Sequence, residues 1–271
     1  MEIAGYLLAA LVGLSLGLIG SGGSVLTVPI LVYVMGINPV LATSYSLFIV
    51  GITSLVGALN NYAKGLVDTK TALLFGITSV VVVFVTRRWL VPLIPHVLFT
   101  AKEFSLTKPV AAMLLFAVLM LFSAVAMIKS GAKNQIAGAA LKKAGILSLT
   151  GYGISIGLVT GLLGAGGGFL IIPVLVLIMG LPVKEAIGTS LLIIALNSLI
   201  GFTGDIGHYN INWHLLLTVS AVSIAGIFAG TALSRKINGA QLKKLFGWFV
   251  LLMGIYIIVK ELFFTTTHGA L

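Results

Sequence analysis

Two glycine-rich segments break long apolar runs at corresponding places in the two halves of this chain. Gly20-Ser-Gly-Gly-Ser24 is followed by Val-Leu-Thr-Val-Pro29, and Gly164-Ala-Gly-Gly-Gly168 is followed by Phe-Leu-Ile-Ile-Pro173. Glycine destabilises a helix interior by up to about 1 kcal/mol relative to alanine, so each cluster indicates an intended break. A duplicated, glycine-broken apolar element is typical of the substrate site of a secondary transporter.

The duplication is longer than the glycine segments themselves. Residues 17–75 match residues 161–219 without a gap, so about half of the protein is a copy of the other half. We therefore predict one membrane domain built from two repeats. The predicted boundaries are 1–130 for the first membrane repeat, 131–144 for a cytoplasmic linker and 145–271 for the second membrane repeat.

The composition places these repeats in a membrane. Hydrophobic residues make up 59% of the chain, charged residues make up 8%, and the mean hydropathy is +1.19, whereas soluble domains average about 25% charged residues. Apolar runs of about 20 residues suit helices that cross a hydrocarbon core of roughly 30 Å. The short alternating segments of a transmembrane barrel are absent from the sequence. We predict an all-α polytopic membrane protein.

Two of the apolar runs are too long for a single crossing. The runs lie at about 3–36, 39–60, 71–86, 109–128, 145–180, 183–204, 213–233 and 245–263. The first and fifth runs contain the glycine segments, which leave a second piece of about 13 residues that reaches only about 20 Å. Each repeat is therefore predicted to combine a glycine-broken element, either re-entrant or a pair of short helices, with three transmembrane helices, or about 8–10 membrane segments in all.

The basic residues predict how the repeats are oriented, because Lys and Arg accumulate in cytoplasmic loops. If each glycine-broken run returns to its starting side or crosses twice, the basic clusters within 129–143 and 235–244 both lie in the cytoplasm. Arg87 and Arg88 then lie on the outer side. Three further crossings per repeat invert the second repeat relative to the first, which would bring the two glycine loops together near the midplane.

The glycine loops are predicted to bind an anion. Glycine allows successive backbone N–H groups to point into one concavity, and the helix that follows adds the positive end of its dipole. Irregular backbone is tolerated at membrane depth where it lines a polar cavity. The substrate-binding residues expected in these loops are Ser21, Gly22, Gly23, Ser24, Gly166, Gly167 and Gly168.

Polar residues at the start of the next helix in each half extend the expected pocket. Ala42-Thr-Ser-Tyr-Ser46 corresponds to Ala186-Ile-Gly-Thr-Ser190, and both segments place hydroxyl groups near a span. Asn197 lies one to two turns deeper and is a candidate for a hydrogen bond to substrate or between helices. These further pocket residues are Thr43, Ser44, Ser46, Thr189, Ser190 and Asn197.

Charged residues at the ends of spans are assigned to the mouths of the pathway. Arg87 and Arg88 close the third crossing of the first half, and Arg235 lies at the corresponding place in the second half. On opposite faces of the membrane, these cations would draw anions to either mouth. Asp205 and His208 also lie at a mouth, where they act either as a gate or as part of a solvated loop.

Several function classes are disfavoured by what the sequence lacks. No carboxylate lies deep in a predicted span, which argues against a cation pathway. The chain has no cysteine and its four histidines lack metal-ligand spacing, so we expect neither a metal nor a cofactor. The net charge of +10 is explained by basic residues at span ends beside anionic headgroups, not by nucleic acid. A membrane enzyme would need a buried acid, base or nucleophile constellation; the sequence suggests none, so we predict that the chain is not an enzyme.

The motifs Gly20-Ser-Gly-Gly-Ser-x4-Pro29 and Gly164-Ala-Gly-Gly-Gly-x4-Pro173, in a chain of this length, resemble the TauE/SafE family of sulfite and organosulfonate exporters. The resemblance covers nearly the whole chain, although Ser24 replaces the third glycine usual in the motif. It implies a multi-pass permease of the prokaryotic inner membrane. Its substrates would be small sulfur-containing anions such as sulfite, thiosulfate or sulfonates such as sulfoacetate.

The sequence thus favours a secondary transporter that works by alternating access, with the anion held at the midplane between the two glycine loops. An anion channel, or a permease for another small carboxylate, would share these sequence features. The expected partners are the small-molecule anion and the lipid bilayer. No nucleic acid is expected, and the sequence leaves a homo-oligomer open.

Overall fold

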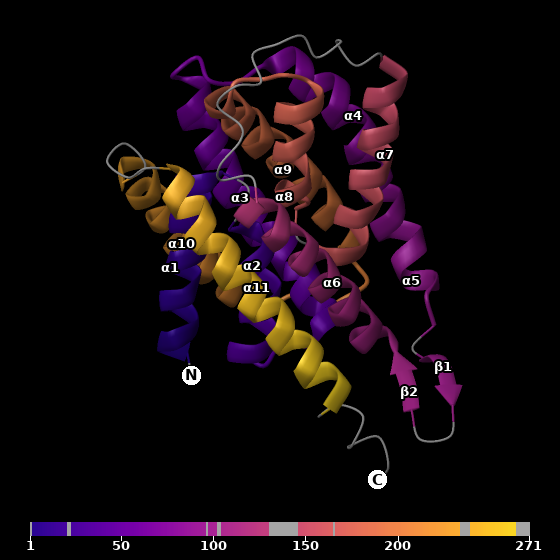
Figure 1. Ribbon diagram of the computed structural model, residues 1–271. Coiled ribbons are helices and arrows are strands. Elements are labelled where there is room, and N and C mark those ends of the chain that lie inside the picture. Colours follow the sequence, from indigo (N-terminus) through magenta and orange to yellow (C-terminus); the bar gives the residue numbers. More distant parts are fainter. Residues whose placement is uncertain are drawn as a thin grey trace.

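In a computed structural model of the chain, residues 2–20, 23–95, 97–101, 104–129, 146–164, 166–233 and 239–263 are described. These residues form a helical bundle with one short hairpin (Figure 1). The helices are α1 (Glu2–Ile19), α2 (Ser24–Pro29), α3 (Pro39–Tyr62), α4 (Thr69–Val85), α5 (Val91–Leu93), α6 (Lys108–Lys129), α7 (Ile146–Leu163), α8 (Gly168–Pro173), α9 (Val183–Asp205), α10 (Trp213–Leu233) and α11 (Gly239–Phe263). Three π-helical turns lie at Ile30–Val34, Thr86–Leu90 and Val174–Ile178.

Helices of membrane-spanning length dominate the bundle, and the chain is an all-α polytopic membrane protein as the sequence predicts. Within the described ranges, five segments are long and apolar enough to cross a membrane: Pro39–Tyr62, Thr69–Leu93, Lys108–Val125, Val183–Asp205 and Trp213–Leu233. The third predicted crossing, 71–86, is therefore too short, because the helix continues through a π-helical turn and α5. The antiparallel strands β1 (Val97–Ala101) and β2 (Phe104–Thr107) then form a hairpin that the sequence did not predict.

The first glycine segment makes a re-entrant hairpin. Gly20 ends α1 with a φ of +81°, a left-handed conformation that glycine adopts without a steric penalty. The chain then turns back through α2, and a Cβ placed on Gly5 would lie 3.0 Å from the Met35 side chain. The beginning of α1 and the end of the hairpin therefore lie side by side, so the segment returns to its starting end instead of crossing.

A proline in each half-helix comes directly before a π-helical turn. Pro29 is the last residue of α2, and Pro173 is the last residue of α8. Proline has no N–H to donate to the preceding turn. The helix continues with the wider hydrogen-bond pattern, in which Met35 N donates to Ile30 O and Met179 N donates to Val174 O.

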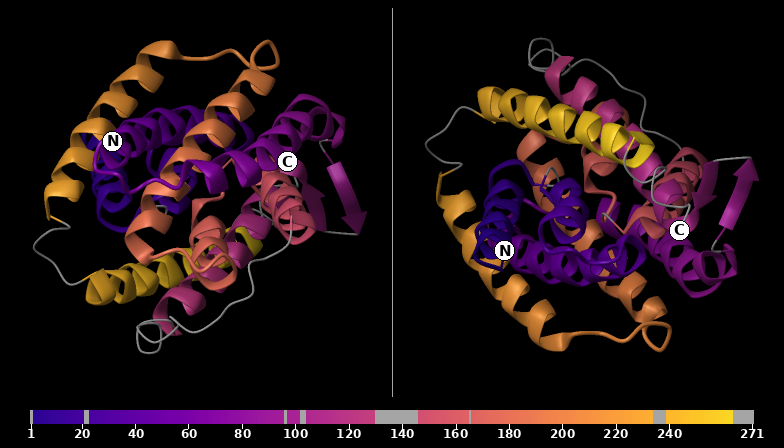
Figure 2. Two further views of the ribbon diagram at one scale, coloured as in Figure 1. Left: turned by 90° about the horizontal axis from the view of Figure 1, so that it is seen from above. Right: turned by 90° about the horizontal axis from the view of Figure 1, so that it is seen from below.

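Helices from the two halves pair with one another throughout the bundle. Helix α3 packs against α9 in an antiparallel manner, because Gly51 lies beside Leu199 and Gly57 lies beside Leu191. Helix α1 packs against α10, and α4 packs against α7. Replacing each helix by its counterpart at the repeat offset converts the α1–α10 contact into the α7–α4 contact, which is the pairing expected of two repeats related by a pseudo-twofold axis. In Figure 2, α10 and α11 lie at the periphery of the bundle, outside α1 and α2.

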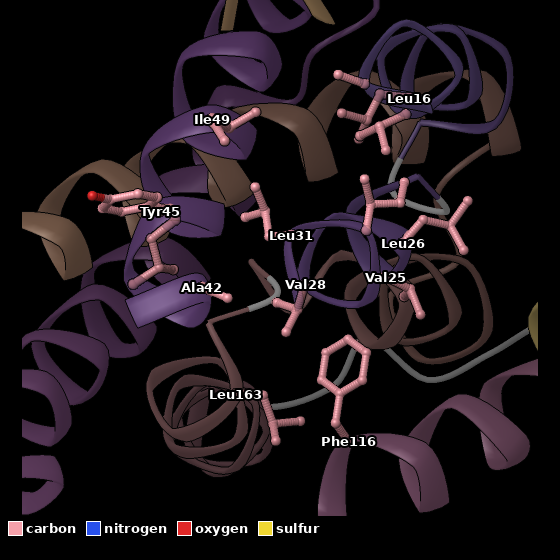
Figure 3. Packing of buried hydrophobic residues seen from close by; sticks show 14 of the residues in the cluster. Leu16, Val25, Leu26, Val28, Leu31, Ala42, Tyr45, Ile49, Phe116 and Leu163 are labelled. Carbon is pink, nitrogen blue, oxygen red and sulfur yellow. The ribbon is translucent and has the colours of Figure 1, made fainter. Parts of the chain in front are cut away.

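The re-entrant half-helix α2 lies in the centre of the bundle. All of its residues, Ser24 to Pro29, are buried. Val28 faces Ala42 of α3 and Leu163 of α7, and Phe116 of α6 belongs to the same cluster (Figure 3). Leu163 directly precedes the second glycine segment, and α2 also contacts α8. Packing of the first hairpin thus places the two glycine-broken elements next to each other inside the protein.

Candidate functional site

A buried ion pair lies at the end of the bundle where α3 begins. Arg87 Nη1 is 3.1 Å from Asp205 Oδ2, and the two side chains are 0% and 1% exposed. The same Nη1 donates a hydrogen bond of 3.0 Å to Thr43 Oγ1. Arg87 lies on the π-helical turn after α4, Asp205 ends α9, and Thr43 is in the first turn region of α3. Three elements from both halves therefore converge on one guanidinium.

The second glycine loop lies directly against this guanidinium. A Cβ placed on Gly164 would be 2.5 Å from Arg87 Nη2 and 2.3 Å from the Thr43 carbonyl oxygen, so the position must be glycine. Its φ of +68° is also left-handed. Gly164 N donates a hydrogen bond to Thr160 O. Helix α7 ends with this bond, and the loop begins at Gly164.

One edge of the guanidinium has no hydrogen-bond partner in the described part of the chain. Arg87 Nε and Nη2 are both buried, and neither has a hydrogen-bond partner among the described residues. These two nitrogens form the side-on edge of the guanidinium, which can donate two parallel hydrogen bonds to an oxyanion. Asp205 engages the other side, through Nη1. The arrangement leaves a buried cation with two donors that have no partner among the described residues, and one of these donors, Nη2, lies against Gly164 of the second glycine loop.

A second cation lies close to this pair. A cavity of about 170 Å³ has Lys108 and Thr43 as its polar lining residues, and apolar walls that include Val40, Val91 and Leu163. Lys108 is near enough to interact electrostatically with both Arg87 and Asp205. Thr43 belongs both to the cavity wall and to the Arg87 site, so the two are adjacent.

The charges of the ion pair also act on Tyr209, in the loop after α9. Burial raises the pKa of the Tyr209 phenol, and the negative charge of Asp205 raises it further while Arg87 opposes the shift. Tyr209 therefore remains a neutral hydroxyl over the physiological pH range. It contributes no negative charge that would compete for Arg87.

Several buried hydroxyl groups of α3 and α9 have no hydrogen-bond partner within the described residues. Ser44 and Ser46 are buried, and their hydroxyl groups have no partner within the described part of the chain. Ser198 is also unpaired, and a Cβ on Gly166 would lie 2.9 Å from its oxygen. Asn197 Oδ1 accepts a hydrogen bond of 2.8 Å from Ser79, whereas its Nδ2 is buried without a described partner. Asn197 thus makes an interhelical bond and retains a free donor.

The other predicted pocket residues have different surroundings. Gly23 packs on Ser15 of α1, and Gly167 packs on Thr160 of α7. Thr189 accepts a hydrogen bond from Asp68 N, at the opposite end of α9 from Asp205, and so joins the α3–α4 loop to α9. The remaining two positions, Ser24 and Gly168, are buried at the starts of α2 and α8, and Ser190 donates to Ile187 O in its own helix.

The predicted mouth residues separate into buried and exposed groups. The solvated alternative is wrong for Asp205, because the carboxylate is buried by its pairing with Arg87. Arg88 and His208 are exposed, and Arg88 donates a long 3.5 Å hydrogen bond to Ile206 O. Ser21, Gly22 and Arg235 lie outside the described residues.

Sequence reasoning missed several polar residues of this region, including Lys108 of the cavity. Ser54 and Ser198 are buried without a partner among the described residues, and they occupy equivalent positions at the offset that relates the glycine loops. That repeat offset was the signal that could have found them. Thr160 is also buried and unpaired beside Gly167, but nothing in the sequence distinguishes it from the other hydroxyl residues of α7.

The chain resembles known membrane proteins over nearly its whole length. The family model described as sulfite exporter TauE/SafE matches residues 6–257. A probable membrane transporter protein of Xylella fastidiosa is 28% identical over 261 residues, which cover 93% of this chain and 92% of the relative. The probable membrane transporter protein YunE of Bacillus subtilis is 27% identical over 276 residues, covering 95% and 96% of the two chains. No solved structure matches the chain.

Proposed function

Starting from the fact that this chain belongs to the sulfite exporter TauE/SafE family of membrane transporters, we propose that it carries small sulfur-containing anions, such as sulfite, thiosulfate or small sulfonates, across the prokaryotic inner membrane. The anion binds between the second glycine loop and side chains of the first half. Rocking of one inverted repeat against the other then exposes this site to each side in turn.

One observation carries the proposal: the unpaired side-on edge of the buried Arg87 next to Gly164. A guanidinium stays protonated at any physiological pH, and its paired donors match the geometry of two oxygen atoms on one anion. Sulfite, thiosulfate and sulfonates all offer such a pair of oxygens. A buried polar group without a partner is costly, so a ligand that completes these hydrogen bonds is favoured.

The arrangement of charges also supports an entry route for the anion. Lys108 lines the cavity beside Thr43, and Thr43 contacts Arg87. An anion attracted by Lys108 would reach Arg87 through the Thr43 side of the cavity. Ser44 and Ser46 on α3 and Ser198 on α9 would supply further neutral donors, because their buried hydroxyl groups have no partner among the described residues.

The test is uptake of labelled sulfite into proteoliposomes that contain the purified protein. A transporter gives uptake that saturates with sulfite concentration and is accelerated by unlabelled sulfite inside the vesicles. Flux that rises linearly and shows no such acceleration would favour an anion channel. Uptake of a small carboxylate in place of every sulfur anion would favour the carboxylate permease.

A matched pair of variants locates the site. Arg87→Lys keeps the charge but removes the paired donors, and we expect it to abolish saturable sulfite uptake. Arg88→Lys makes the same chemical change at the adjacent exposed arginine and should retain uptake. If Arg87→Lys transported sulfite as well as Arg88→Lys does, the anion would not bind at this guanidinium.

A further inference from the structure

The buried carboxylate of Asp205 occupies the same guanidinium that we assign to the substrate. Asp205 Oδ2 contacts Arg87 Nη1, while the Nε and Nη2 edge beside Gly164 stays unpaired. The pair therefore uses one donor where the geometry of a carboxylate would permit two. Nη2, at one end of the remaining edge, lies beside Gly164 of the glycine loop.

Packing alone does not account for the pair. At the repeat offset, the counterpart of Asp205 is Asn61, whose Nδ2 donates to Gly57 O within its own helix. The contacts Gly161–Thr86 and Gly17–Gly230 show that the counterpart of Arg87 is Thr231, which donates to Ile227 O. The other half builds the same helix crossing with neutral residues, so the scaffold does not need charges at these positions.

A buried ion pair also contributes little net stability to the folded protein. Desolvation of two charges offsets most of their attraction, and well-packed apolar residues often stabilise a protein equally well. A pair that keeps two donors of the cation unsatisfied is less favourable still. The charges are better explained by a ligand that shares them.

We propose that Asp205 is an internal counter-anion that competes with the transported oxyanion for Arg87, and thereby sets the affinity of the site and allows release of the substrate. This inference rests on the proposed function. With Asp205 in place, the guanidinium is already neutralised, so a bound oxyanion brings an uncompensated negative charge into a buried site. Without it, the cation would hold the oxyanion too tightly to let it leave quickly.

The surrounding charges are compatible with this role. Lys108 is the other cation near the pair, and the exposed Arg88 bonds to the neighbouring Ile206 carbonyl. Tyr209 stays neutral, and the exposed His208 bonds through its backbone N–H to the Asp205 carbonyl. Among the described residues in contact with Arg87, Asp205 is therefore the one that carries a negative charge.

The decisive measurement compares sulfite binding to the wild-type protein and to Asp205→Asn, by titration of the purified proteins in detergent. Removing the negative charge that neutralises Arg87 strengthens the attraction between the guanidinium and a bound oxyanion, so we expect Asp205→Asn to bind sulfite about tenfold more tightly. Counterflow in proteoliposomes should become slower at saturating sulfite, because release is impeded. Glu185→Gln, the same chemical change on the same helix α9 far from Arg87, should alter neither quantity.

Two further variants keep the test decisive if Asp205→Asn folds poorly. Asp205→Ser removes the charge with a smaller side chain and should also bind sulfite more tightly. Arg87→Gln combined with Asp205→Asn replaces the pair by neutral residues of similar size, and this protein should fold but not bind sulfite. Tighter binding by either neutral variant at position 205, absent in the double variant, supports the inference.

The outcomes separate this inference from the proposed function. If the wild-type protein binds sulfite and both neutral variants at position 205 bind it equally or more weakly, Asp205 is structural and the inference is wrong while the proposed function stands. If neither the wild-type protein nor any variant binds sulfite or another sulfur anion, the proposed function and the inference both fail.

Discussion

The two glycine loops have the same framework but different chemical surroundings. The first glycine of each loop has a left-handed φ and packs on the start of the central helix of the other half. Gly20 meets the side chain of Ile187, whereas Gly164 meets Thr43 and the guanidinium of Arg87. Thr43 and Ile187 are equivalent positions in the repeat.

This difference shows that the packing of the duplicated helices does not depend on the charged site. Symmetric packing positions both loops, but among the described residues a guanidinium lies against the second loop and not against the first. Arg87 and Thr43 come from the first half, whereas the loop and Asp205 come from the second, so the site is assembled across the repeat.

The largest difference is expected when the charge itself is removed. Arg87→Gln leaves Asp205 buried without a partner, and breaking a buried ion pair in this way costs about 3–5 kcal/mol of stability. The equivalent change at the first loop, Thr231→Ala, removes a hydroxyl bonded within its own helix and should cost less than about 1 kcal/mol. Thermal unfolding of both variants in detergent provides the measurement.

The double variant Arg87→Gln/Asp205→Asn is the control for this prediction. It removes both charges, so most of the lost stability should return. If Arg87→Gln were no less stable than Thr231→Ala, the carboxylate would not be buried against the arginine in the folded protein.

Most of the framework could be predicted from the sequence, because its signals are local. Helix positions follow from apolar runs, and the breaks at Gly20 and Gly164 follow from glycine clusters that recur at a constant offset. The sequence left open whether the broken segments cross. The contact between Gly5 and Met35 shows that the first segment returns to its starting end. A local sequence pattern does not reveal a contact between residues this far apart in the chain.

The charged site could be predicted only in part, because it depends on contacts between distant residues. Arg87 and Arg88 look alike in sequence, and both were expected at a mouth. In the fold, Arg87 is buried because Asp205, 118 positions away, neutralises it, and the helix can then continue to Leu93. Nothing in the local pattern indicates which arginine is paired or which carboxylate pairs with it.

The next largest difference concerns the glycines themselves. Both Gly20→Ala and Gly164→Ala place a side chain at positive φ, which costs about 1–2 kcal/mol. At Gly164 the new Cβ would also meet the fixed Thr43 carbonyl oxygen, whereas at Gly20 it would meet the movable side chain of Ile187. Overpacking costs about 1–3 kcal/mol more, so we expect Gly164→Ala to be the less stable protein by about that amount.

The unfolding midpoints of the two alanine variants test this expectation. Gly36→Ala is a useful reference, because Gly36 has a similar φ of +69° but open space at its Cβ position. It reports the cost of the backbone conformation alone. Equal midpoints for Gly20→Ala and Gly164→Ala would show that the second loop can move away from Thr43 and Arg87.

A smaller difference is expected at the serines that flank the central helices. Ser79→Ala removes the donor to Asn197 Oδ1 and leaves a buried amide oxygen unpaired, which costs about 1–3 kcal/mol. Ser223 is the equivalent residue, and it donates to Ala9 O in the backbone of α1. Ser223→Ala should cost about 1 kcal/mol or less, since that oxygen also belongs to a helical turn. Equal losses of stability in the two variants would contradict this assignment.

The smallest effect is expected at the entry to the cavity. Lys108→Gln removes a positive charge beside the cavity but leaves Arg87 and the glycine loop in place. Because a single nearby charge raises the local concentration of anions only modestly, we expect the half-saturating sulfite concentration to rise about threefold at low salt. High salt screens the interaction, so the difference from wild type should shrink as ionic strength increases.

Lys70→Gln, at the exposed start of α4 and the opposite end of the bundle, is the matched control. A loss of saturable transport in Lys108→Gln that salt does not change would instead place Lys108 in direct contact with the substrate, and the site would then extend beyond the second glycine loop into the cavity.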